Sequence, residues 1–311
     1  MVSQLPKTFR PPLSEFTEYN LGTAILYTLA YSDLFDYPLT AKEIQRYLIG
    51  FRADIKQVRI MLPYLQEGAL VARGKEYFAL PGRENTFVLR QMRSDLSTVL
   101  WHDAVRYGRW ISKLPFVRMV AATGALVSNN VEAGADLDYF IIAEPGWLWT
   151  TRAMILALDR VTARSGTGAR ICPNYIITTN SLVLPEADLF TAQEMTRMVP
   201  MSGFGLYHKF RRENSWTDDF LPNAQGYPWQ LANGFSIGKN RSTVERIMDN
   251  PVARQLEQWE MQRKIRKFSG MTSENNETRF SADLCKGHFD GHKAQTLQAF
   301  EDRIRGLGIC K

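Results

Sequence analysis

The stretch that most constrains the fold is residues 116–142, FVRMVAATGALVSNNVEAGADLDYFII. Two apolar runs, each typical of a buried strand, flank a turn that begins at Gly124. The second run carries Asp136 and Asp138, and side chains at positions i and i+2 of a strand point to the same face. We therefore expect a strand–turn–strand unit that presents two carboxylates on one face of a sheet.

This pair of carboxylates predicts a magnesium and nucleotide site. Mg²⁺ is usually bound by one or two carboxylates together with substrate phosphates. A glycine such as Gly124, at the start of a short helix, lets backbone N–H groups approach a phosphate closely. We expect Asp136 and Asp138 to be metal ligands and catalytic residues. The expected cofactor is Mg²⁺, and the expected co-substrate is an NTP, with ATP as the first candidate.

The order of these residues resembles the polymerase-β-type nucleotidyltransferase superfamily. Its signature is a strand, a Gly-Ser pair at the head of a short helix, a spacer, and Asp-x-Asp on the next strand. Here Gly124-Ala125 is followed by ten residues and then by Asp136-Leu137-Asp138. Most of the chain is also similar to uncharacterised bacterial proteins described only as nucleotidyltransferase-like. The resemblance implies metal binding by both aspartates and phosphate binding at Gly124 and Ala125.

The chain departs from this family pattern at two positions. Ala125 stands where the family has serine, so Thr123 or Ser128 would have to supply the hydroxyl that contacts phosphate. The third carboxylate is missing from the next predicted strand, ICPNYIIT, where Asn174 takes the central position and is our candidate to line the nucleotide pocket. Other acids are candidates for that third role: Glu144, Glu186 and Glu194.

Three interpretations of the aspartate pair stay open: an active Mg²⁺-nucleotide site, a strand-end pair that only caps turns, and a nucleotide-binding domain without activity. The first implies transfer of a nucleoside monophosphate to a hydroxyl or similar acceptor. A small molecule or a protein is expected as the acceptor in preference to a nucleic acid. The alternative function is a nucleic-acid-binding or regulatory protein with a catalytically degenerate core.

Residues 15–83 are predicted to form a winged-helix-like domain. Three helical patterns precede a hairpin with its tip at residues 73–75, and Thr40 with Glu43 forms a capping box. Pro63 is expected to kink the third helix or to mark its boundary. Two functions stay open for this domain. It reads a DNA groove with its third helix, which offers Lys56, Gln57 and Arg59, or it packs against the next domain or a partner.

The remaining chain divides into three segments. Residues 84–114 are predicted to form a linking helix, whose arginines (Arg90, Arg93, Arg106, Arg109) we expect to lie mostly on a solvated face. Residues 115–215 form the nucleotidyltransferase-like core with a small mixed sheet, and residues 216–311 form a helical C-terminal region. The predicted fold class is therefore α+β.

Composition narrows the possible partners and compartment. No apolar run approaches the ~20 residues of a membrane span, and the N-terminus lacks a signal-peptide core, so we expect a cytoplasmic protein without a membrane partner. The cysteines (Cys172, Cys285, Cys310) are scattered and support neither a disulfide framework nor a zinc site. A net charge of +6 is compatible with a nucleotide or nucleic acid but identifies neither. The oligomeric state is left open.

Overall fold

The computed structural model describes residues 20–164, 169–228, 243–269, 279–287 and 292–308. Its N-terminal unit contains three helices, α1 (Leu21–Asp33), α2 (Ala41–Arg46) and α3 (Ile55–Glu67). Three short strands, β1 (Leu39–Thr40), β2 (Ala72–Gly74) and β3 (Tyr77–Ala79), form an antiparallel sheet in the order β1-β3-β2. The elements follow the expected sequence, and their interpretation as a winged helix stays a prediction. Residues 15–19 of the predicted domain lie outside the described residues.

Local side-chain caps explain where these helices begin. The Thr40 side chain accepts from the backbone N–H of Glu43, and the Glu43 carboxylate accepts from the backbone N–H of Thr40, which confirms the predicted capping box. Asp54 and Gln57 cap α3 in the same reciprocal way. Pro63 does not mark a boundary, because α3 continues through it to Glu67.

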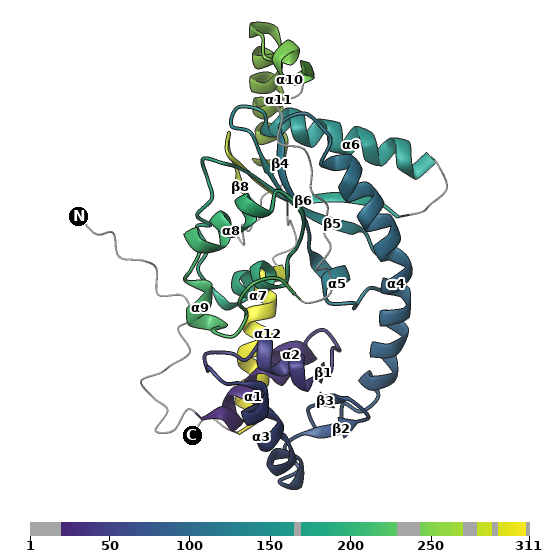
Figure 1. Cartoon of the computed structure of the whole chain (residues 1–311), viewed down its shortest axis with the longest axis vertical. Coiled ribbons are helices and arrows are strands. Elements are labelled where there is room, and N and C mark those ends of the chain that lie inside the picture. Colours follow the sequence, from purple (N-terminus) through teal and green to yellow (C-terminus); the bar gives the residue numbers. More distant parts are fainter. Residues whose placement is uncertain (1–19, 165–168, 229–242, 270–278, 288–291, 309–311) are drawn as a thin grey trace, which may run out of the picture.

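A long helix, α4 (Thr86–Ile111), runs from the N-terminal unit to the core (Figure 1). Arg106 and Arg109 are exposed, as expected, but Arg90 and Arg93 are buried. Arg90 lies 2.8 Å from the Glu43 carboxylate, and Arg93 pairs with Glu132. The prediction of a mostly solvated face was wrong for these two arginines, because each pairs with a carboxylate of another segment, which compensates its burial.

The core is built on a six-stranded mixed sheet in the order β7-β4-β5-β6-β9-β8. Strands β4 (Val117–Ala122) and β5 (Leu137–Ala143) are antiparallel, and β6 (Ile171–Thr178) runs parallel to β5. Strand β7 (Val199–Ser202) pairs with β4, while β8 (Arg279–Phe280) and β9 (Leu284–Lys286) extend the other edge. The short helix α5 (Gly124–Val127) follows β4 directly.

Helices cover both faces of this sheet (Figure 1). Residues of α4 and α6 (Leu148–Arg164) share one apolar cluster with the sheet, against which α11 (Pro251–Ser269) also packs. Residues of α7 (Leu189–Arg197) and α8 (Phe204–Glu213) share the cluster on the opposite face. The short helices α9 (Thr217–Phe220) and α10 (Thr243–Met248) complete this part of the chain. The result is an α+β fold, as predicted.

The C-terminal region does more than form helices. It supplies β8 and β9 to the core sheet, which the sequence did not predict. Its last helix, α12 (His292–Gly306), packs beside α1 (Figure 1), and the Phe300 ring meets Tyr31 edge-on at 5.4 Å. Cys172 and Cys285 are free thiols, and Cys310 lies outside the described residues. Within the described parts of the chain, no helix is long and apolar enough to cross a membrane.

Candidate functional site

The turn at Gly124 and the carboxylate of Asp138 lie against each other. The backbone N–H of Thr123 donates to the carbonyl oxygen of Asp138 at 3.0 Å, because the ends of β4 and β5 pair here. Gly124 adopts φ +70°, a conformation that favours glycine. A methyl group on Gly124 would overlap Asp138 Oδ2 and lie 3.1 Å from Asp138 Cγ. The space beside the glycine is therefore already taken by this carboxylate.

Asp138 is the more buried member of the aspartate pair and lies opposite Cys172 of β6. Burial raises the pKa of Asp138 to about 7, and a hydrogen bond from Cys172 partly opposes this rise. The charges of Glu194 and Asp136 raise the pKa further. Burial also raises the pKa of the Cys172 thiol to about 12, so this cysteine remains a neutral donor.

Asp136 occupies a different environment from its partner. It directly precedes β5 and is exposed to solvent, whereas Asp138 is half-buried within the strand. The pKa of the exposed Arg170 guanidinium is raised mainly by Asp159 and to a smaller extent by the charge of Asp136. Two carboxylates two residues apart thus combine one solvated acid and one desolvated acid at the same strand end.

A third carboxylate, Glu194 of α7, belongs to the same region. Its charge raises the pKa of Asp138, so the two groups lie within electrostatic range. Burial raises the pKa of Glu194 itself, and the cations Arg197, His292 and Lys286 oppose this shift. Helix α7 positions Glu194 because Asp188 caps its N-terminus, accepting from Thr191 N–H at 2.8 Å.

The other two acids proposed for the third role are engaged elsewhere. Glu144 accepts from Arg118 Nε at 2.8 Å, at the far end of β5 from Asp138. Glu186 lies 3.7 Å from the ammonium of Lys286 and 3.4 Å from Nε of Arg279. Of the three candidates that the sequence offered, Glu194 is the one whose charge reaches Asp138.

The remaining predicted residues are placed less centrally. Ala125 is exposed on α5. The Ser128 hydroxyl accepts from Arg197 at 3.1 Å, so it already has a protein partner. Asn174 lies in an irregular part of β6, where the register shifts between Cys172 and Tyr175, so Cys172 pairs with Asp138 in the place where Asn174 was expected.

Thr123 is the hydroxyl closest to the predicted phosphate turn. Its side chain is 4% exposed, and no hydrogen-bond partner satisfies its Oγ1 within the described residues. A buried hydroxyl without a partner carries a desolvation cost. Of the two substitutes that the sequence offered for the family serine, Thr123 has no partner for its hydroxyl in the described part of the chain, whereas Ser128 already accepts from Arg197.

The structure also bears on metal binding. Among the residues that the structure describes, no three His, Cys, Asp or Glu side chains are gathered closely enough to hold a metal ion. An ion at Asp136 and Asp138 would therefore need further oxygen ligands, which Mg²⁺ ordinarily takes from phosphates and water. The all-oxygen donor set and the glycine turn fit that mode of binding.

Comparison with known proteins adds no relative. No family model, no curated protein and no solved structure matches the chain.

Proposed function

We propose that this protein is a Mg²⁺-dependent nucleotidyltransferase that moves a nucleoside monophosphate from an NTP to a hydroxyl-bearing acceptor. The proposal rests on one observation above the others, the close approach of the Asp138 carboxylate to the Gly124 turn. Asp136 and Glu194 add two further acids around the same strand end. The cytoplasm, where nucleotides and Mg²⁺ are available, is the compartment we propose.

Each residue of the site has a distinct role in the proposed reaction. Asp136 and Asp138 would hold Mg²⁺, which when bound neutralises charge on the phosphates. The Thr123 hydroxyl, which has no partner within the described chain, would donate to a phosphate oxygen beside Gly124. An acceptor hydroxyl would attack the α-phosphate in line, forming a P–O bond as the bond to the β-phosphate breaks and pyrophosphate leaves.

Glu194 is our candidate to receive the proton that the acceptor hydroxyl loses. Burial raises the pKa of Glu194, which brings this carboxylate closer to the value that suits a general base at neutral pH. Glu194 would then be the general base, a role for which the sequence alone offered no residue, because Asn174 has no basic group. An amide at that position is unable to accept a proton at neutral pH.

The alternative, a nucleic-acid-binding protein with an inactive core, has some support in the N-terminal unit. Helix α3 exposes Lys56, Gln57 and Arg59, as a groove-reading helix would. The same helix also exposes the large apolar side chains of Ile60 and Tyr64, each 63% accessible, which suit a phosphate backbone poorly. We therefore favour the transferase, since it explains why the Asp138 carboxylate lies against the Gly124 turn.

The test is Mg²⁺-dependent binding and turnover of radiolabelled NTPs by the full chain. We expect calorimetry to detect Mg·ATP binding, and we expect Asp138→Asn to abolish transfer to a panel of hydroxylated metabolites and proteins. Asp95→Asn is the matched control, because Asp95 is an exposed acid on α4. Equal binding by wild type and Asp138→Asn, together with no transfer of any NTP to any acceptor, would refute the proposal.

A further inference from the structure

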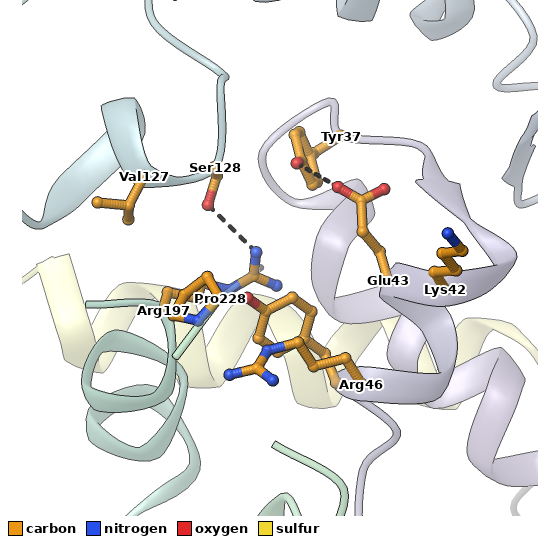
Figure 2. Close-up of a pocket in the computed structure, with 9 residues that line it drawn as sticks. Tyr37, Lys42, Glu43, Arg46, Val127, Ser128, Arg197 and Pro228 are labelled. Atoms are coloured by element: carbon orange, nitrogen blue, oxygen red, sulfur yellow. Dashed lines mark hydrogen bonds between the residues drawn. The ribbon is translucent and has the colours of Figure 1, made fainter. Parts of the chain in front are cut away.

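A pocket separate from the aspartate pair lies where α2 of the N-terminal unit meets the core (Figure 2). Lys42, Glu43 and Arg46 reach it from α2, while Ser128 and Arg197 reach it from the ends of α5 and α7. The pocket encloses about 360 Å³ with its open mouth, of which about 20 Å³ admits the centre of a water molecule. A single water needs about 10–15 Å³ on this measure, so a small group would sit partly in the open mouth and a whole nucleoside does not fit.

The charges that line this pocket are unbalanced. Its one acid, Glu43, is already paired with Arg90 at 2.8 Å and accepts from the Tyr37 hydroxyl at 2.8 Å. Lys42, Arg46 and Arg197 form no ion pair with any carboxylate in the described parts of the chain. Three cations that form no direct ion pair within the described residues, around a cavity whose one acid is already paired with Arg90, favour an anion that carries more than one charge.

The cations are held in place by neutral groups, so the site is built before any ligand arrives. Arg197 donates to Ser128 Oγ at 3.1 Å and to Gln193 Oε1 at 3.0 Å, and its guanidinium lies 3.9 Å from the centre of the Tyr47 ring. Arg46 donates to the backbone carbonyl oxygens of Gln225 and Gly226. A preorganised cation loses little entropy when it binds an anion.

Like charges are crowded beside the pocket, which also favours binding of an anion. The guanidinium carbons of Arg90 and Arg197 lie 3.7 Å and 6.0 Å from the centre of the same Tyr37 ring. Nε of Arg90 and Nε of Arg46 are buried without a hydrogen-bond partner in the described chain. Burial and then the charge of Arg197 lower the pKa of Arg90 to about 9. A bound anion would offset this repulsion.

We propose that this pocket binds a phosphate group. A carboxylate, with one negative charge, would leave most of the positive charge unbalanced, whereas a phosphate brings nearly two charges and several acceptor oxygens. The pocket is also linked to the aspartate pair by two short helical paths, from Gly124 to Ser128 along α5 and from Glu194 to Arg197 along α7. Ser128 follows Gly124 by four residues and Arg197 follows Glu194 by three, so the same two short helices contribute residues to both sites.

The experiment is calorimetric titration of the full chain with inorganic phosphate at fixed ionic strength. We expect saturable binding by the wild type and a loss of about 10- to 100-fold in affinity for Arg197→Gln and for Lys42→Ala. Lys42 is exposed, so Lys42→Ala tests the site without a risk to folding. Lys56→Ala on α3 is the matched control, since it removes one exposed lysine elsewhere. No saturable phosphate binding, or equal weakening by Lys56→Ala, would overturn the proposal.

Two further arms separate this proposal from the proposed transferase. Asp138→Asn should still bind phosphate, because the pocket does not use that carboxylate. Adding Mg·ATP then identifies the source of the phosphate. Competition with inorganic phosphate assigns the pocket to the nucleotide's own phosphates, and simultaneous binding assigns it to a second phosphorylated molecule. Loss of phosphate binding in Asp138→Asn would refute an independent pocket.

Discussion

Replacing Gly124 with alanine is the sharpest test of how the glycine turn and the Asp138 carboxylate depend on each other. Gly124 has φ +70°, and the added methyl group would overlap Asp138 Oδ2. Gly134 is a natural control, because it has φ +81°, lies ten residues further along and has no atom within 4 Å of the same methyl position. The two substitutions share backbone strain and differ in the collision.

The expected magnitudes follow from these two terms. A non-glycine residue in the left-handed region costs about 1–2 kcal/mol, so both variants should lose about that much free energy of unfolding. At Gly124 the Asp138 carboxylate must also retreat by roughly 1 Å to restore van der Waals separation. A displacement of that size in a reacting group costs about 100-fold in rate. Gly124→Ala should therefore lose far more transfer activity than its stability loss explains.

The assay pairs urea denaturation with Mg·ATP binding and transfer rates for wild type, Gly124→Ala and Gly134→Ala. We expect similar denaturation midpoints for the two variants, because the methyl group at Gly124 meets the end of a side chain that can turn away, and we expect a rate defect in Gly124→Ala alone. If Gly134→Ala loses as much activity as Gly124→Ala, general strain accounts for the defect and the proposed role of the Asp138 contact is wrong. Unchanged nucleotide binding and turnover in Gly124→Ala would refute the reasoning equally.

Two predictions concern stability away from the site. Hydrogen bonds from Arg170 hold the pKa of buried Asp159 below its usual value, so the ionised carboxylate stabilises the folded state. This stabilisation is complete above the unfolded pKa of about 3.9 and disappears as pH falls through the folded pKa. Asp159→Asn should thus lower the urea midpoint more at pH 6 than at pH 2.5, and an equal effect at both pH values would contradict this. Gly203→Ala should lower the free energy of unfolding by about 2–5 kcal/mol, because at φ +69° the added methyl group overlaps the Arg118 carbonyl oxygen. Gly82→Ala, at φ +80° with open space around the methyl group, should lower it by about 1–2 kcal/mol. Equal losses in urea denaturation would refute the collision.

Much of the fold was readable from the sequence because its central elements carry strong local signals. The strands β4, β5 and β6 are mostly apolar runs with one or two polar residues each, and the Thr40 capping box marks α2 directly. Strands β7, β8 and β9 were missed for a physical reason. They have two to four residues each, too few for a period-2 pattern, and they exist because the longer strands offer unpaired edges.

Only the part of the candidate site that is formed by residues close in sequence could be predicted from the sequence. Residues close in sequence, such as Gly124 and Asp138, were paired correctly by the strand–turn–strand pattern. The contribution of Glu194 depends on how α7 packs against the sheet, and that packing leaves no spacing signal. The burial of Arg90 was missed for the same reason, since its partner Glu43 is 47 residues away in the chain.

The packing of the N-terminal unit bears on which of its two possible functions is the stronger. Its apolar core is shared with other parts of the chain: Phe300 and Ile304 from α12, Leu189 from α7 and Phe220 from α9 belong to the same buried cluster. A module whose core is completed by distant segments does not move as an independent reader of DNA. Its α2 helix instead supplies Lys42 and Arg46 to the lining of the pocket that we propose binds phosphate. Packing beside the core, and completing this proposed ligand site, is therefore the function that these contacts favour.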